Sequence, residues 1–321
     1  MRASEPKISV VICTRNRAAL LEKCLLSLEG QSLMADAFEV LVIDNGSSDE
    51  TPRILDKFAE RLPLAAIPEP VVGLSRARNT GWRAAHSDHI AFLDDDAMAD
   101  PGWLASALHS FKTVQPFPAA MTGPIRLAWE QPAPQWLTPD IQGCLGRLDF
   151  GVGPRKFGGM ETLFGANCFF HRRILERFGG FNERLGRLNT VLLSGEETLL
   201  QRQIENAGEC LWYDPKASVR HWVPAERATP GWFYRRYYWG GISDYFMERI
   251  LGPVKGSPGS QREQGRLQRV MRNFMYSAGL ASQTNVVHGR IYVSYVAGWL
   301  VGSLKWRRMG GTNVSVELHE Q

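Results

Sequence analysis

The chain has 321 residues, of which 44% are hydrophobic and 22% charged, so it holds ample material for a globular core in one large or two medium domains. The net charge of +4 is uneven. Residues 251–321 carry nine basic and three acidic side chains, whereas residues 1–250 carry 28 basic and 30 acidic ones. This balance argues against nucleic-acid binding by residues 1–250. We expect the basic tail, residues 251–321, to bind an anionic partner.

Cysteine usage and the N-terminus indicate where the chain works. The five cysteines are scattered and show neither a CxxC pair nor zinc-ligand spacing, which favours a reduced cytosolic compartment. The polar segment Met1–Lys7 leads straight into an apolar run, so we expect no signal peptide. No apolar run reaches the roughly 18 to 20 residues that a bilayer-spanning helix needs.

Short apolar runs alternate with helical patterns over the first hundred residues. The expected strands are Ile8–Cys13, Phe38–Ile43, Leu64–Ile67 and Ile90–Leu93. The expected helices between them cover residues 18–30, 51–61 and 73–85. Such alternation predicts an α/β fold with a mostly parallel sheet flanked by helices.

Three polar loops follow the first, second and fourth of these strands, at Thr14–Arg17, Asp44–Asp49 and Asp94–Asp96. Ligands of such sheets bind at the carboxyl ends of the strands, so we expect the three loops to converge on one cleft. No GxGxxG motif follows the first strand, which disfavours a dinucleotide-binding domain, and the absence of GxxxxGK[ST] excludes a P-loop.

The third loop places three carboxylates in a row directly after an apolar strand, in the stretch His89–Asp96. Adjacent acids repel one another, and their burial would be costly without a cation. Mg²⁺ or Mn²⁺ with oxygen ligands is the usual solution. The alternative is a solvated acidic turn in which Asp96 or Asp100 caps a helix. The triplet alone favours neither.

The second half of the chain is less regular. A helix is expected from Trp103 to about residue 114, and residues 116–160 lose any clear period. Further expected strands are 164–170, 210–213 and 217–221, and further expected helices are 173–178, 197–207 and 232–251.

The basic tail begins with a Gly- and Pro-rich linker over residues 252–265 and continues with helical candidates at 267–280 and 290–304. The second candidate is apolar and carries Trp and Arg flanks, which suits a helix lying on an anionic membrane surface. The alternative is a helix packed on the body of the protein or on a second subunit. The oligomeric state is open.

Taken together, the segments Val10–Arg17, Val42–Thr51, Gly73–Gly81 and Phe92–Asp96 resemble the family 2 glycosyltransferases, which are inverting enzymes with the GT-A fold. The similarity covers about residues 7–240 and rests on several motifs in the right order. It implies a nucleotide-sugar-binding half over residues 1–120, an acceptor-binding and catalytic half over 121–251, and a tail, 252–321, outside the family pattern.

The resemblance implies donor-binding roles for residues of several loops: Thr14, Arg15, Arg17, Asp44, Arg78 and Asn79. The first three belong to the loop that holds the base and ribose of a nucleotide sugar. Asp44 matches the carboxylate that binds the base, usually uracil, and its alternative role is a turn cap. Arg78 and Asn79 match a segment lining the donor pocket, and their alternative is helix surface and helix capping.

A metal site is also implied. Asp94 and Asp96 match the DXD motif, in which Asp94 would touch the ribose and Asp96 would bind Mn²⁺ or Mg²⁺ against the diphosphate. Asp95 could substitute for either acid, because three in a row blur the register. His221 stands where a neutral imidazole completes the metal shell in many GT-A enzymes, although a lone histidine is often structural.

The acidic pair after Ser194 matches the position of the family's catalytic base. Glu197 is preferred over Glu196 as the group that deprotonates the acceptor hydroxyl, although acids in a first helical turn are also favourable without any catalytic role. Arg227 is expected to contact the diphosphate once the donor is bound.

These assignments predict an inverting, metal-dependent transfer of a sugar from a UDP-type donor to a hydroxyl of a glycan or lipid-linked saccharide, as in polysaccharide biosynthesis for a cell envelope. We expect a cytoplasmic chain, peripheral on the inner face of the cell membrane through residues 265–308. The alternatives are an inactive membrane-associated component that binds nucleotide sugars or glycans, and a nucleotidyltransferase.

Overall fold

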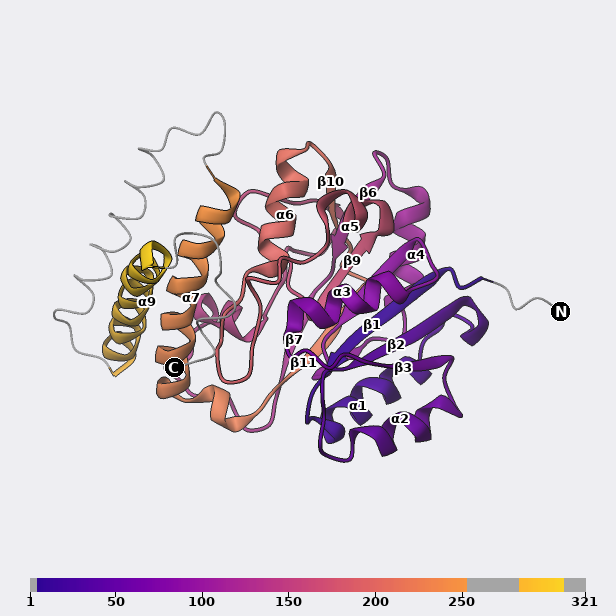
Figure 1. Cartoon of the computed structure of the whole chain (residues 1–321), viewed down its shortest axis with the longest axis horizontal. Helices are drawn as coiled ribbons and strands as arrows, with labels where there is room; N and C mark the ends of the chain where they lie inside the picture. Colours follow the sequence, from indigo (N-terminus) through magenta and orange to yellow (C-terminus); the bar gives the residue numbers. More distant parts are fainter. Residues whose placement is uncertain (1–4, 253–282, 309–321) are drawn as a thin grey trace. The chain divides into compact units, whose positions relative to one another are not determined.

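A computed structural model of the chain describes residues 5–252 and 283–308 (Figure 1). The described residues form two units. The first joins the residues up to 128 with 146–183 and 196–222, and the second joins 129–145, 184–195 and the residues from 223 onward. The expected linker after Gly252 and the expected helix at 267–280 lie outside the described residues.

The first unit is built on a large mixed sheet with the strand order β3-β2-β1-β4-β9-β6-β10-β8. Its strands are β1 (Ile8–Thr14), β2 (Phe38–Asp44), β3 (Leu64–Pro68), β4 (His89–Leu93), β6 (Pro118–Thr122), β8 (Arg155–Lys156), β9 (Asn167–His171) and β10 (Cys210–Tyr213). The first four in sequence pair in parallel, as expected. The antiparallel strand β9 lies between β4 and β6.

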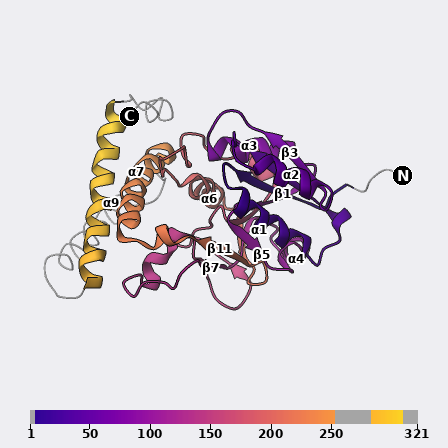
Figure 2. The ribbon, with the colours of Figure 1, turned by 90° about the horizontal axis from the view of Figure 1, so that it is seen from below.

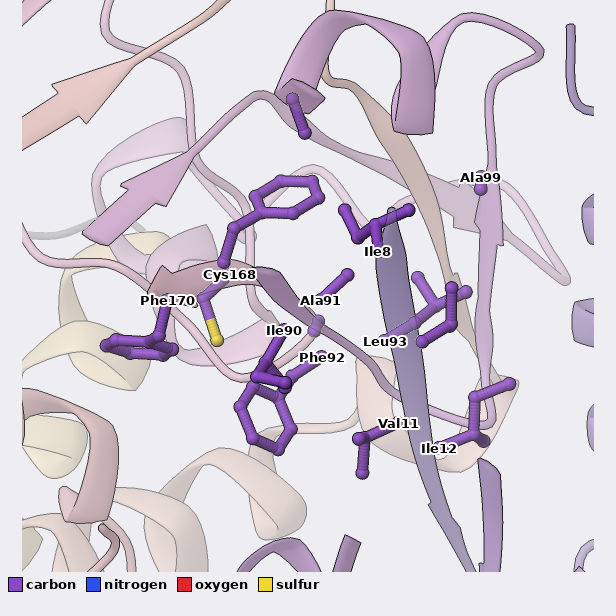
Figure 3. Packing of buried hydrophobic residues seen from close by; sticks show 14 of the residues in the cluster. Ile8, Val11, Ile12, Ile90, Ala91, Phe92, Leu93, Ala99, Cys168 and Phe170 are labelled. Atoms are coloured by element: carbon purple, nitrogen blue, oxygen red, sulfur yellow. The ribbon is translucent and has the colours of Figure 1, made fainter. Parts of the chain in front are cut away.

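The strands form because their apolar side chains are buried on both faces of the sheet. All of Ile8–Ile12 is at most 1% exposed, as is Ile90–Leu93. Figure 3 shows side chains of β1, β4 and β9 packed together, and the rings of Phe92 and Phe170 meet edge-on with centroids 6.0 Å apart. Each fully buried side chain of this size contributes about 1.5–3 kcal/mol of transfer free energy.

Helices cover both faces of the sheet. They are α1 (Ala18–Glu29), α2 (Thr51–Ala59), α3 (Leu74–Ala84), α4 (Trp103–Thr113), α5 (Arg172–Phe178) and α6 (Glu196–Asn206). In Figures 1 and 2, α3 and α1 lie on opposite sides of β1. Helix α3 approaches the sheet closely at Gly81, where an added Cβ would lie 2.3 Å from Val11 Cγ1.

A second sheet of the order β5-β11-β7 combines β5 (Ala97–Ala99), β7 (Ile125–Trp129) and β11 (Val219–Val223). Two expected strands begin later than their sequence patterns suggest. β9 starts at Asn167 because its N–H donates to Phe164 O and closes a turn. β11 starts at Val219 because Ala217 N–H donates back to Asp214 O.

The second unit contains two 3₁₀ segments, η2 (Pro139–Leu145) and η3 (Ala225–Ala228), and two long helices, α7 (Pro230–Leu251) and α9 (Gln283–Arg308). Thr229 caps α7, because its hydroxyl accepts from Trp232 N–H at 3.4 Å. The helix expected at 290–304 is confirmed and extends further at both ends. Among the described helices, none combines the length and hydropathy needed to cross a membrane.

Candidate active site

The three polar loops converge at the carboxyl edge of the sheet, as predicted. Thr14 and Asp44 are register partners at the ends of β1 and β2. The Thr14 hydroxyl donates to Asp95 Oδ2 at 2.8 Å, which joins the first loop to the third. The Asn16 N–H donates to Ser47 Oγ at 3.0 Å, which joins the first loop to the second. Polar side chains of all three loops therefore lie together at this edge of the sheet.

The three consecutive carboxylates contact different partners. Asp94 accepts from Arg78 NH2 at 2.9 Å, and Asp95 accepts from Arg17 NH1 at 2.8 Å. Asp96 accepts from the same Arg17 nitrogen at 3.0 Å, and its Oδ1 lies 3.0 Å from His221 Nε2. The two arginines neutralise part of the charge that three adjacent acids concentrate.

Asp95 accepts hydrogen bonds from two side chains of the first loop. Both of its oxygens accept from protein donors, one from Thr14 and one from Arg17. Burial raises the pKa of Asp95 to about 6, against the lowering effect of the Arg17 guanidinium. Asp95 in turn raises the pKa of Arg17, so this pair stays ionised together. Asp95 therefore holds the first loop in place through Thr14 and Arg17, and it is not among the three residues whose ligand atoms gather as a candidate cation group.

Asp94, Asp96 and His221 form a donor group that fits a divalent cation. One ligand atom from each of the three lies within 4.8 Å of the others. His221 is 7% exposed, and the ring nitrogen that lies 3.0 Å from Asp96 Oδ1 is Nε2. A buried imidazole beside two carboxylates can serve as a neutral nitrogen ligand. Two carboxylates and an imidazole are appropriate ligands for Mn²⁺.

Arg78 connects this acidic group to the acidic pair at the start of α6. It is 3% exposed, and its NH1 donates to Glu196 Oε1 at 2.6 Å while NH2 donates to Asp94. Burial alone would lower the pKa of Arg78, but Asp94 and Glu196 raise it above its usual value. The guanidinium is therefore a fixed positive charge between the two sets of carboxylates.

Gly165 is a site residue whose role the sequence did not reveal. A Cβ added there would lie 2.0 Å from Arg78 NH2 and 2.6 Å from Arg78 Cζ. The group that approaches the Gly165 backbone is therefore the Arg78 guanidinium. In the sequence, the only signal of this close approach is a glycine shortly before a strand. The fold is needed to identify Arg78 as the side chain beside it.

Glu197 differs from Glu196 in its surroundings. Glu196 is 3% exposed and shares a salt bridge with Arg78. Glu197 is only partly covered as a residue, yet its Oε2 is withheld from solvent and has no hydrogen-bond partner among the described residues. Burial and the neighbouring Glu196 raise the pKa of Glu197 to about 8. A carboxylate in this state is suited to accept a proton near neutral pH.

Other predicted donor-binding residues have different surroundings. Asp44 Oδ1 accepts from Ser47 N–H at 2.9 Å, which is the turn-capping contact. Arg15 is half-buried in the loop between β1 and α1. Arg227 is buried within η3 of the second unit. Their roles toward a donor stay predictions.

Asn79 is buried in a protein network. It donates to Phe181 O at 2.8 Å and accepts from Phe181 N–H at 2.9 Å, and its Oδ1 also accepts from Trp82 Nε1. The side chain therefore fastens the loop after α5 to α3. These contacts support a structural role for Asn79 more directly than contact with a donor.

Comparisons with known proteins find related sequences and structures. The model of glycosyl transferase family 2 matches residues 9–140. A glucosyl-dolichyl phosphate glucuronosyltransferase of Haloferax volcanii is 25% identical over 96% of this chain and 99% of its own length. The succinoglycan biosynthesis protein ExoM of Rhizobium meliloti is 26% identical over 73% of this chain and 72% of its own.

Solved structures show the same fold. A mannosyltransferase, PcManGT, from Pyrobaculum calidifontis in complex with GDP-Man and Mn²⁺ superposes with a TM-score of 0.56 and 19% identity, over 96% of this chain and 76% of that one. TarS of S. aureus, residues 1–349, in complex with UDP-GlcNAc gives 0.54 and 15% identity, over 94% and 92%. The chain thus has the GT-A fold, its resemblance to the family 2 glycosyltransferases is confirmed, and the matches support glycosyltransferase activity.

Proposed function

We propose that the chain is an inverting, metal-dependent glycosyltransferase that uses a nucleoside diphosphate sugar, with UDP as the nucleotide. The observation that carries this proposal is the junction at Arg78. One guanidinium bonds both Asp94 of the candidate cation group and Glu196 of the acidic pair. A cation-binding group and a candidate base thereby belong to one connected site.

The donor end of the site is assigned to the carboxyl edge of the sheet. Asp94, Asp96 and His221 would hold Mn²⁺ or Mg²⁺ against the diphosphate. When bound, the ion neutralises the negative charge that develops on the departing diphosphate. Thr14, Arg15 and Arg17 belong to the loop beside it, where the base and ribose are proposed to bind with Asp44 at the neighbouring strand end. Arg227 is proposed to meet the diphosphate.

The chemical step is a single displacement. Glu197 takes the proton of the acceptor hydroxyl while the hydroxyl oxygen bonds to the anomeric carbon. The bond from that carbon to the diphosphate oxygen breaks, the electron pair leaves with the nucleoside diphosphate, and the configuration inverts. Glu197 is preferred to Glu196 because Glu196 already carries the salt bridge to Arg78.

The proposed acceptor is a hydroxyl of a glycan or of a lipid-linked saccharide. Support comes from two relatives whose names include glucosyl-dolichyl phosphate and succinoglycan. A lipid-linked acceptor would be reached from a membrane surface, where residues 265–308 would associate. The sequence supports this placement because residues 251–321 carry a net charge of +6.

A thermal-shift screen of nucleotide sugars with Mn²⁺ or Mg²⁺ tests the proposal, because a specific ligand stabilises the folded state in proportion to its affinity. We expect a UDP-sugar to raise the Tm only when the divalent ion is present. Turnover with an acceptor should release the nucleoside diphosphate. Release of pyrophosphate instead would identify a nucleotidyltransferase, and binding without turnover on any acceptor would identify a binding component.

A further inference from the structure

One side of α9 carries a line of uncovered apolar side chains, which we call the outer stripe: Val286, Val293, Leu300 and Leu304. They are 49%, 55%, 53% and 55% exposed. At about 100° per residue, the four fall within about 40° of one another around the helix. They extend over about 27 Å of its length at 1.5 Å per residue. Large apolar side chains aligned in this way indicate a surface that another apolar phase covers.

The opposite side of α9 is fixed against α7, and the two helices run side by side in both views (Figures 1 and 2). A Cβ added at Gly298 would lie 1.8 Å from Tyr238 O, and one added at Gly241 would lie 2.1 Å from Tyr295 O. The Tyr295 hydroxyl donates to Asp244 at 2.5 Å. Such close backbone packing sets the rotation of α9, so the outer stripe stays turned away from α7.

The tryptophans of α9 contribute to this inner packing. The rings of Trp299 and Tyr245 have centroids 5.1 Å apart, and those of Trp306 and Phe246 are 5.6 Å apart. The aromatic flanks that suggested a membrane-lying helix in the sequence therefore pack against α7. The uncovered surface is the narrower outer stripe.

Charge identifies the chemistry of what covers this stripe. Helix α9 contains four Lys or Arg residues and no Asp or Glu. Arg290 and Arg308 lie about 40° to one side of Val286, and Arg307 lies about 60° to the other. All three arginines are exposed. An apolar line with cations on both sides fits an apolar partner with an anionic rim.

A second copy of the chain does not fit this pattern, because pairing two outer stripes would bring the three flanking arginines of each copy together, with no acid on either helix. An anionic lipid surface fits both features, since it offers acyl chains below a layer of negative headgroups. We propose that the outer stripe, with Arg290, Arg307 and Arg308 beside it, docks the chain on the surface of an anionic phospholipid bilayer. The docking proposal deepens the proposed function, because a lipid-linked acceptor would be met at the same bilayer surface. It rests on the proposed function in this respect alone.

Vesicle co-sedimentation of the full chain tests the proposal. The vesicles contain phosphatidylcholine alone or phosphatidylcholine mixed with phosphatidylglycerol. We expect binding to the mixed vesicles only, weakened by salt. The double variant Leu300→Asn/Leu304→Asn should lose about tenfold or more in binding, and Arg307→Gln/Arg308→Gln should remove the preference for the anionic lipid. Leu26→Asn is the matched control, because Leu26 is a 46% exposed leucine on α1.

Equal binding to both vesicle types, or an equal loss in the Leu26 control, would overturn the proposal. A dimer in light scattering that the double leucine variant abolishes would also overturn it in favour of self-association. Donor binding measured by thermal shift on the same samples separates the two proposals. Loss of vesicle binding with normal donor binding concerns the stripe alone, whereas vesicle binding without any donor binding contradicts the glycosyltransferase assignment and leaves the stripe standing.

Discussion

The substitution Gly165→Ala tests whether the Arg78 guanidinium must stay in place between Asp94 and Glu196. The new Cβ would lie 2.0 Å from Arg78 NH2, whereas ordinary contact begins at 3.4 Å. The guanidinium must therefore move by at least 1.4 Å, the difference between these distances. Its hydrogen bonds of 2.9 Å to Asp94 and 2.6 Å to Glu196 leave no slack for such a shift.

The expected loss combines opposing effects. Overpacking in a filled interior destabilises by about 1–3 kcal/mol, and weakening buried charge pairs adds to this. Replacing glycine in an ordinary backbone conformation regains about 0.4–1 kcal/mol through the unfolded chain, and Gly165 lies outside the left-handed region. We expect a net destabilisation of about 1–3 kcal/mol and, because the acidic pair is displaced, a fall in kcat of about 100-fold.

The assay combines urea unfolding with steady-state kinetics on the same preparations. Gly153→Ala is the matched control, because a Cβ at Gly153 meets no atom within 4 Å. A second comparison places Gly165→Ala in an Arg78→Lys background, where the shorter cation leaves room for the methyl group. We expect most of the loss caused by the alanine to disappear in this background. Wild-type stability and kcat in Gly165→Ala, or full additivity with Arg78→Lys, would refute it.

Three further outcomes are expected. Asp96→Ala should abolish donor hydrolysis and transfer with an unchanged circular dichroism spectrum, and normal wild-type turnover in excess EDTA would contradict the metal role. Glu197→Gln should keep donor binding and lose transfer. Because the pKa of Glu197 is raised to about 8, kcat/KM should rise as the pH approaches that value. The free energy of unfolding should fall as the pH rises from about 4.5 to about 8, because the folded state favours the neutral form of Glu197. Glu197→Gln should remove this pH dependence of stability. Asn79→Ala should destabilise the protein by about 2–5 kcal/mol, because it leaves the buried backbone N–H and C=O of Phe181 without their hydrogen-bond partner. The KM for the donor should change little. A raised KM at normal stability would instead support the donor-lining role.

The strands and the convergence of their loops followed from pattern alone. Period and β-branched content identified the first four strands, and the shared edge of a parallel sheet required their loops to meet. The register of Thr14 with Asp44 and the bond from Thr14 to Asp95 confirm that expectation. Strand ends at β9 and β11 were less predictable, because turn hydrogen bonds at Asn167 and Ala217 decide them.

The different contacts made by Asp94, Asp95 and Asp96 could not be predicted from the sequence. The surroundings of each of the three adjacent carboxylates are set by Arg17, Arg78 and His221, which lie on other elements of the fold. The bond between Arg78 and Glu196 joins residues 118 positions apart, and nothing local indicates it. A DXD pattern therefore predicts the chemistry of this edge of the sheet, while the fold bonds Asp95 to Thr14 and Arg17 and brings Asp94 and Asp96 together with His221.

The position of β9 has a consequence for how the chain is made. β9 begins at Asn167 and completes the sheet between β4 and β6, which are both synthesised long before it. Until that segment is synthesised, the facing edges of β4 and β6 lack their partner strand and readily pair with other chains. The stretch that matches the family model, residues 9–140, should therefore aggregate when expressed alone. Chaperone dependence should end only once translation passes Tyr213, because β10 covers the other edge of β6.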